Sequence, residues 1–539
     1  MLFCWLCIAL FSLQIASHVN GFDVPESDFF DYRQQAVELR NLSWPEQFKR
    51  PPLFQSAVAM VSLVFQGPAR ELTAAELIIA VSAVLSLLLV YRIARHYLGD
   101  NGFWAAWLWA FHPVTLRMAI KPKPEFLVTL LILWAVDRFI RKDRRAYLIA
   151  FFATMVRYEG ALAIAAFVLT DLIFSRKRLI TIGLGALSGS FIVVWTLIQQ
   201  GGSGGASYGN YFSDYRFNIE YLRTFWVGML NAFPVQGFKI WTALALLFSL
   251  LGAIAGLRRQ PRTTVMGGIF LAGFVFMHMI WPFSNIDYTV IVSWIVLIAI
   301  VGGFSVAVDF AGNKLRSMGL ASWNSSTSLI AVAFAVLLAV SVFLIRHRFA
   351  YPQYNIDIMA VAIAVLVMAG FLWHQSDQRI KTTAVAGLIL AALLAFYLNS
   401  QTQADLFDIR YSKAEYRAAA EWFASHRRAG DRMAIDQPVI AAFYTDLDPD
   451  RDLVRLADLP SLEPAELAAW LKENDVCTIA WLSTHRLLNR DDNWYRWKRD
   501  NRGWQNVTFL EAGQDLPDFD HLVSLTRGPR IAHIYRVCN

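Results

Sequence analysis

Three carboxylates lie close together near the start of the chain, between Glu26 and Asp31. If this segment is helical, Asp28 lies one turn from Asp31 and Tyr32, on the same face. A carboxylate there can take a proton from an attacking hydroxyl group or bind a divalent cation. The alternative is a solvated cap on a helix at a membrane surface. Asp28, Asp31 and Tyr32 are therefore candidate site residues, with Asp28 as a candidate metal ligand.

A cluster of cations forms a second candidate site. It consists of Arg117, Lys121 and Lys123, and Glu125 follows at the start of an apolar run. Such a cluster needs an anionic partner, and phosphate is the obvious one. An ionisable residue near the lipid boundary, such as Glu125, is costly and often functional. The alternative is that the long cationic side chains only reach towards water.

Two arginines are further candidates for contacting phosphate. Arg50 precedes Pro51 and Pro52, which fix how the following helix enters the membrane, so a structural role for Arg50 is equally compatible. Arg157 lies between two short apolar segments and is followed two residues later by Glu159. The opposite charges of Arg157 and Glu159 predict either an ion pair between these two residues or part of a cavity wall.

Tyr288 is the remaining candidate for binding substrate. It flanks a predicted turn together with His278, Trp281 and Asp287. Aromatic residues at such turns also serve as anchors at the membrane interface.

The elements that carry these residues are predicted to be membrane spans. Of the 539 residues, 56% are hydrophobic and only 17% are charged, and the mean hydropathy is +0.40. A soluble protein has about a quarter of its residues charged. Apolar runs long enough to span or enter a membrane recur through the first 400 residues. Thirteen are predicted, at 1–18, 72–91, 103–116, 125–140, 146–156, 160–174, 179–198, 238–257, 264–280, 288–308, 327–345, 357–373 and 382–398.

The distribution of basic residues predicts the orientation of these spans. If the loop after the first span lies outside, the inside loops hold 17 Lys and Arg in 50 residues. The outside connections hold 13 in 117. This bias follows the positive-inside rule and places the C-terminal part outside the cytoplasm. It also explains the net charge of +7 without a nucleic-acid partner.

Two predicted domains follow from this division. Residues 1–399 form the membrane domain, with two long outer loops at 21–70 and 199–237. The second loop begins with a glycine-rich segment at 201–205 and is predicted to be a mobile lid.

Residues 400–539 are predicted to form a soluble α/β domain. Helices are expected at 413–427 and from Pro464, and strands at 433–436 and 476–483. A hairpin is expected from 521–526 and 531–537. Cys477 and Cys538 lie in this domain and could pair in an oxidising compartment.

The order of these features resembles a known family. An acidic motif follows the first span, then Arg50-Pro51-Pro52-Leu53, a second acid at the start of span four, and a closing soluble domain. The segments 28–36, 416–423 and 430–432 are the most similar in detail. The chain resembles the GT-C glycosyltransferases, in particular bacterial proteins similar to protein O-mannosyltransferases and lipid A aminoarabinose transferases.

This resemblance implies a function and a role for each candidate residue. The expected enzyme is a hexosyl- or pentosyltransferase of a plasma (inner) membrane, which moves a sugar from a polyprenyl-phosphate carrier to a glycan, lipid or protein hydroxyl. Asp28 matches the family's first acid, which activates the acceptor or holds a metal, and Glu125 matches the second. The leaving phosphate would be stabilised by Arg50, Lys121, Lys123 and Arg157. Many members have a second acid directly after the first, where this chain has Phe29, so Asp31 is an alternative to Asp28.

Two other functions are compatible with the composition. A multi-pass transporter or flippase is one, although it would be expected to show internal repeats and charges deep within its spans. A non-catalytic assembly subunit is the other. The candidate residues gather at the predicted outer ends of the spans instead, which favours an enzyme that acts at the membrane surface.

Overall fold

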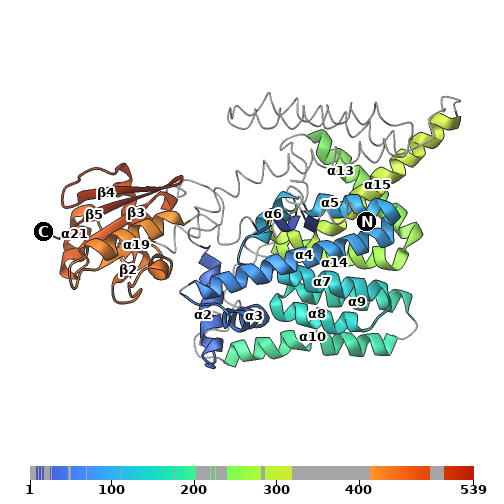
Figure 1. Cartoon of the computed structure of the whole chain (residues 1–539), viewed down its shortest axis with the longest axis horizontal. Coiled ribbons are helices and arrows are strands. Elements are labelled where there is room, and N and C mark those ends of the chain that lie inside the picture. Colours follow the sequence, from blue (N-terminus) through green and yellow to red (C-terminus); the bar gives the residue numbers. More distant parts are fainter. Residues whose placement is uncertain are drawn as a thin grey trace. The chain divides into compact units, whose positions relative to one another are not determined.

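The computed structural model divides the chain into two compact units. Unit 1 comprises Met1–Ser17, Glu46–Phe54 and Leu77–Asp405, and unit 2 comprises His18–Pro45, Gln55–Glu76 and Leu406–Asn539. Figure 1 shows both units. Apart from scattered positions in 8–25 and 219–225, the structure describes residues 27–45, 50–67, 69–110, 112–175, 178–201, 239–280, 286–317, 413–485 and 503–538.

Unit 1 is helical throughout its described residues, apart from short connections and 3-10 turns. Helices α7, α8, α9 and α10 follow one another and pack as sequential neighbours (Figure 1). The helices are α4 (Arg70–Leu98, which begins in unit 2), α5 (Gly102–Ala110), α6 (Pro113–Ala119), α7 (Glu125–Ile140), α8 (Arg145–Val156), α9 (Glu159–Phe174), α10 (Arg178–Gly201), α13 (Lys239–Arg259), α14 (Pro261–Ile280) and α15 (Val290–Ser317).

Four helical segments among the described residues are long and apolar enough to cross a membrane: Arg70–Ala110, Arg178–Gln199, Pro261–Ile280 and Asp287–Ala307. This agrees with a polytopic membrane protein. The predicted spans at 327–345, 357–373 and 382–398, most of 1–18 and most of the lid at 199–237 lie outside the described residues.

The predicted span 103–116 is interrupted in the structure. Helix α5 ends at Ala110, and α6 begins at Pro113 with His112 as its N-cap. The His112 side chain accepts a hydrogen bond from the Val114 N–H at 3.1 Å. Proline is favoured at the first position of a helix and cannot continue one, so it starts a new helix here.

The three helices that carry the central candidates are short. Helices α7 and α9 have 16 residues each and α8 has 12. At 1.5 Å per residue they are roughly 24 and 18 Å long. A bilayer core is about 30 Å thick. The predicted spans 146–156 and 160–174 correspond to α8 and α9, and both helices are shorter than the bilayer core.

Helix α15, which follows the candidate Tyr288, packs closely against α13. A side chain at Gly252 of α13 would overlap the backbone of Ala299, and one at Gly303 of α15 would overlap the backbone of Phe248. Only glycine permits this approach of two helix backbones. The close packing fixes the position of α15 in unit 1.

Unit 2 contains a five-stranded mixed sheet of order β2-β1-β3-β5-β4. Strands β1, β2 and β3 are parallel, whereas β3, β5 and β4 are antiparallel neighbours. The strands are β1 (Met433–Ile435), β2 (Leu453–Arg455), β3 (Thr478–Leu482), β4 (Asp520–Arg527) and β5 (Arg530–Arg536). The predicted hairpin and the strands near 433 and 476 agree with the structure.

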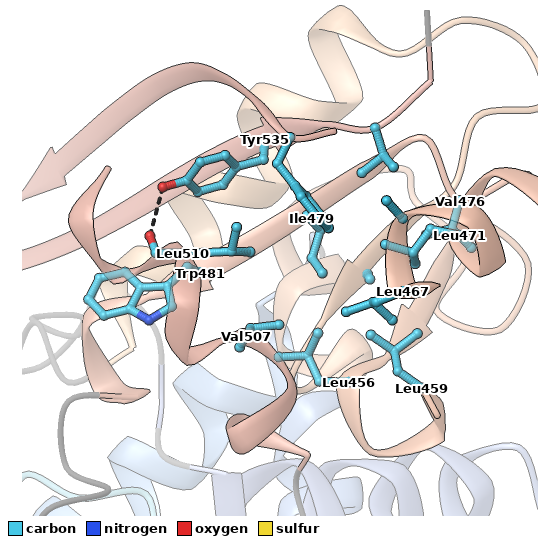
Figure 2. Packing of buried hydrophobic residues seen from close by; sticks show 14 of the residues in the cluster. Leu456, Leu459, Leu467, Leu471, Val476, Ile479, Trp481, Val507, Leu510 and Tyr535 are labelled. Atoms are coloured by element: carbon cyan, nitrogen blue, oxygen red, sulfur yellow. Dashed lines mark hydrogen bonds between the residues drawn. The ribbon is translucent and has the colours of Figure 1, made fainter. Parts of the chain in front are cut away.

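Helices cover both faces of this sheet. Helix α21 (Pro464–Glu473) packs with the 3-10 segment η6 (Trp504–Ala512) over Ile479, Trp481 and Tyr535, as Figure 2 shows. Successive strand residues point to opposite faces, so helix α19 (Ala414–His426) is placed on the other face, against β5 and β4. The Tyr535 hydroxyl donates to the Leu510 carbonyl at 2.7 Å and closes the core (Figure 2).

A disulfide joins Cys477, at the start of β3, to Cys538, which follows β5. It ties the central strand to the end of the chain. The sequence left this pairing open, and the structure contains it.

Unit 2 also contains the helices that follow the first acidic motif. Helix α2 (Ser27–Arg40) carries Asp28 and Asp31, and α3 spans Leu53–Ser62, beginning in unit 1. The Gln55 side chain donates to Gln35 at 2.7 Å and links the two helices. Phe30 of α2 packs edge-on against Phe443, which follows the short helix α20 (Pro438–Ala441).

Candidate anion-binding site

The site in unit 1 begins with the connection between α6 and α7. Arg117 lies in the last turn of α6, and Lys121 and Lys123 lie in the connection itself. Pro122 and Pro124 alternate with the lysines and restrict their backbone. The Lys123 N–H donates to the Lys121 carbonyl at 2.7 Å, which tightens the turn.

Asp287, in the 3-10 turn η2 (Ile286–Thr289), holds two of these cations. Lys121 Nζ donates to Asp287 Oδ2 at 2.8 Å, and Arg117 Nη2 lies 2.9 Å from Oδ1. Lys121 and Asp287 are both buried, each 2% exposed. Charged residues are almost never buried unless they are paired, and here one carboxylate serves two cations.

The turn between α8 and α9 supplies the second half of the site. Arg157 donates to Glu125 Oε1 at 2.8 Å and to both oxygens of Glu159 at 2.8 to 3.1 Å. A side chain at Gly160 would overlap the backbone at Ala153 and Thr154, so glycine lets α9 start close against the end of α8.

Helix termini determine where these charges are stable. Glu125 and Glu159 are the first residues of α7 and α9, at the positive ends of the helix dipoles. Arg157 follows the last residue of α8, at a negative end. The second oxygen of Glu125, Oε2, is buried and has no hydrogen-bond partner among the residues that the structure describes.

An aromatic wall completes the site. The Arg157 guanidinium lies 4.8 Å from the centre of the Tyr288 ring, and the His278 ring lies 5.3 Å from the same ring. His278 Nε2 is 3.9 Å from Glu159 Oε1. His278 is near the end of α14, so it comes from the same α14–α15 connection as Asp287 and Tyr288.

Together these residues define what we call the Glu125 cluster. Its members are Arg117, Lys121, Lys123, Glu125, Arg157, Glu159, His278, Asp287 and Tyr288. The set contains four cations and three carboxylates. Two of the cations, Lys121 and Lys123, are buried, at 2% and 7% exposed. Buried cations at helix ends suit an anion that brings its own negative charge into the site.

The structure brings together six of the residues predicted from the sequence: Arg117, Lys121, Lys123, Glu125, Arg157 and Tyr288. Glu159, His278 and Asp287 were not predicted to be site residues. The sequence shows them beside Arg157 and Tyr288. Glu159 pairs with Arg157 two residues away, whereas the pairing of Asp287 with Lys121 spans 166 residues of chain. The sequence signal that could have identified these three residues is the recurrence of charged or aromatic residues at the same end of several predicted helices.

The remaining predicted residues are carried by α2 and by the segment before α3. Asp28, Asp31 and Tyr32 share one face of α2 in unit 2; the two aspartates are half-buried and Tyr32 is buried. Arg50 is half-buried, shortly before α3. Among the described residues no group of three His, Cys, Asp or Glu side chains is arranged to hold a metal ion.

Fold and site together describe a polytopic helical membrane protein with a buried cationic site at helix ends. Residues 49–198, which include most of this site, match the family model of dolichyl-phosphate-mannose-protein mannosyltransferases. The curated proteins give no significant sequence match.

Solved structures show the same fold over nearly the whole chain. ArnT from Cupriavidus metallidurans bound to undecaprenyl phosphate is similar with a TM-score of 0.57 and 14% identity, covering 98% of this chain and 97% of that one. The apo state of that ArnT gives 0.54 at the same identity and coverage. An oligosaccharyltransferase from Archaeoglobus fulgidus reaches only 0.43 at 11% identity, covering 89% and 69%, which is too low to indicate a shared fold. The family model matches less than a third of the chain, and the two ArnT structures share its fold.

Proposed function

We propose that this protein transfers a sugar from a polyprenyl-phosphate carrier to an acceptor hydroxyl group at the outer face of a plasma membrane. The observation that carries the proposal is the convergence of four cations, two of them buried lysines, at the helix ends of the Glu125 cluster. The family model is described for dolichyl-phosphate-mannose, and the similar ArnT structure contains undecaprenyl phosphate. A polyprenyl phosphate is the anion that would reach a cationic site within the membrane region.

The position of the cluster suits a lipid-linked donor. Helices α7, α8 and α9 are shorter than the bilayer core, so their ends at the cluster can lie below the membrane surface. The carrier's isoprenoid tail lies in the bilayer, and its phosphate is held near the boundary. A recessed cationic site can therefore meet the phosphate without drawing the tail out of the lipid.

The proposed reaction is a displacement at the anomeric carbon of the sugar. The acceptor oxygen forms the new bond to this carbon as the bond from carbon to phosphate oxygen breaks, and the acceptor proton passes to a carboxylate. The phosphate leaves with an additional negative charge. Arg117, Lys121, Lys123 and Arg157 would stabilise that charge in a site already oriented by Asp287, Glu125 and Glu159.

The proposal assigns proton transfer to a carboxylate of α2 or to Glu125. Asp28 and Asp31 lie one helical turn apart, and either could accept the proton. Glu125 Oε2 is the cluster oxygen without a partner among the described residues, and it could accept a hydrogen bond from the substrate. Asp28 is also the proposed ligand of a divalent cation, which would activate the acceptor instead.

The proposal places the C-terminal domain outside the cytoplasm. The disulfide between Cys477 and Cys538 supports this placement, since disulfides persist in oxidising compartments. The excess of basic residues in the predicted inside loops supports the same orientation.

The test measures transfer of a labelled sugar from polyprenyl-phosphate donors in membranes that contain the wild-type protein, Asp28→Asn, Asp31→Asn or Glu125→Gln. Wild-type transfer is expected, with loss of at least about 100-fold in the variant that removes the proton acceptor. The three variants must remain inserted and folded, which is checked by their melting temperatures in detergent. Chelation with EDTA tests the cation, because only a metal-dependent reaction stops.

Two outcomes would contradict the proposal. One is the absence of transfer by the wild-type protein from any polyprenyl-phosphate donor. The other is transfer that none of the three substitutions changes. The first would favour the transporter or assembly-subunit alternatives, and the second would exclude Asp28, Asp31 and Glu125 as the proton acceptor.

A further inference from the structure

A second group of charges lies in unit 2, at the start of α4. Glu71 is in the first turn of this helix, and its side chain is 3% exposed. Arg40 donates a short hydrogen bond to Glu71 Oε1, and Arg70 Nε lies 3.0 Å from the same oxygen. Arg33 Nε lies 3.7 Å from Glu71 Oε2, beyond hydrogen-bond distance. We call Arg33, Arg40, Arg70 and Glu71 the Glu71 cluster.

The Glu71 cluster has more positive charge than its internal pairing requires. Three guanidinium groups face one carboxylate, which leaves two positive charges among these described residues. A clamp between α2 and α4 would need only the Arg40–Glu71 pair. Like charges held this close repel one another, so the arrangement gains from a further anion.

Two of the arginines are accessible to a ligand. The side chains of Arg33 and Arg70 are 32% and 38% exposed, whereas that of Arg40 is 10% exposed. Arg33 Nε is itself buried and has no hydrogen-bond partner within the described part of the chain. The Arg33 guanidinium lies over the Phe443 ring, 4.8 Å from its centre, which holds it in place.

The position of the cluster along the chain indicates the type of anion. Arg70 is the first residue of the apolar segment Arg70–Ala110, which is long enough to cross a membrane. The start of such a segment lies at the level of the lipid headgroups. The abundant anion at that level is the phosphate of a phospholipid, and guanidinium groups match phosphate oxygens in pairs.

We propose that the Glu71 cluster binds the phosphate of an anionic phospholipid headgroup, with Arg33 and Arg70 in contact with the phosphate and Glu71 holding Arg40. This proposal does not depend on sugar transfer. Bound lipid would join α2, the start of α4 and, through Phe443, the sheet domain of unit 2.

The test titrates the purified full-length protein in detergent with phosphatidylglycerol or phosphatidylcholine and counts bound lipids by native mass spectrometry. The wild-type protein is expected to retain phosphatidylglycerol more strongly. Arg33→Gln and Arg70→Gln should each weaken that binding about tenfold. Glu71→Gln should strengthen it, because it removes the competing carboxylate. Arg141→Gln, which removes an exposed arginine from a different helix, is the matched control and should bind as the wild type does.

Competition with inorganic phosphate distinguishes the source of the anion. Failure of phosphate to displace the lipid supports a headgroup site. Displacement at millimolar phosphate supports an anion site that also accepts free phosphate and overturns the assignment to lipid. Equal retention of both lipids by the wild type, or unchanged retention in Arg33→Gln and Arg70→Gln despite lowered melting temperatures, would show that the cluster is only a structural clamp.

Discussion

Helices α7, α8 and α9 carry charged clusters at both ends, and the two ends are built differently. At the end opposite the Glu125 cluster, Asp137 is paired with Arg92 at 3.1 Å and with Arg141 at 3.3 Å. Asp171 is paired there with Arg262 at 2.8 Å and accepts a hydrogen bond from the Tyr147 hydroxyl. We call these six residues the Asp171 cluster.

The two clusters differ in the burial of their cations. In the Asp171 cluster the side chains of Arg92 and Arg141 are 44% and 55% exposed, so water screens their charge. In the Glu125 cluster Lys121 and Lys123 are 2% and 7% exposed. Burial of the cations therefore distinguishes the end that could bind an anion.

The helix dipoles explain why the two ends need their cations for different purposes. Asp137 and Asp171 lie in the last turns of α7 and α9, where the dipole disfavours a carboxylate. Their arginines are needed to hold them. Glu125 and Glu159 lie at helix starts, where the dipole already favours a carboxylate. Glu125 and Glu159 therefore depend less on the cations of their cluster, and those cations are more available to an external anion.

The largest expected effect separates the two ends by activity. Lys121→Ala should lower sugar transfer at least about 100-fold, because it removes a preorganised donor to the leaving phosphate. Arg92→Ala, at the Asp171 cluster, should leave the rate within about twofold, because its partner Asp137 keeps Arg141. Initial rates with a labelled polyprenyl-phosphate sugar give the comparison. Equal losses in both variants would mean that the two ends do not differ in function.

The second effect concerns stability. Arg157→Gln leaves Glu125 and Glu159 buried without their shared cation, and losing one partner of a buried pair costs about 3–5 kcal/mol. Arg262→Gln leaves Asp171 partly solvated and still bonded to Tyr147, so about 1 kcal/mol is expected. Melting temperatures in one detergent should thus fall much further for Arg157→Gln. A larger fall for Arg262→Gln would show that the Asp171 cluster is the more tightly coupled end.

Much of the site could be predicted from the sequence because its residues are close together in the chain. Arg117, Lys121, Lys123 and Glu125 lie within nine positions, and their charge contrasts with the apolar runs around them. The pairing of Arg117 and Lys121 with Asp287 could not be predicted, since it depends on how the α6–α7 region and η2 meet. Hydrophobic periodicity locates helices but contains no information about which helix ends become neighbours.

In the fold, too, local features could be predicted and features that depend on long-range contacts could not. Helix α19 and the β4–β5 hairpin are local structures with clear patterns, and both were predicted. The interruption before Pro113 was missed because the apolar run continues through it, so hydropathy dominated over the proline signal. Strand β2 was also missed, since three residues are too few to show alternation and its place depends on pairing with β1.

The smallest effect tests whether exposure really separates the two ends. Arg141 is the most exposed cation of the Asp171 cluster, and it shares Asp137 with Arg92. Arg141→Gln should therefore change stability by less than about 1 kcal/mol, and added salt should remove most of that difference by screening. Melting temperatures of this variant and the wild type, measured at 50 and at 500 mM NaCl, provide the test. A difference that persists at high salt would mean that Asp137 depends on Arg141 in a shielded environment, and the contrast in burial between the two ends would then lose its explanatory value.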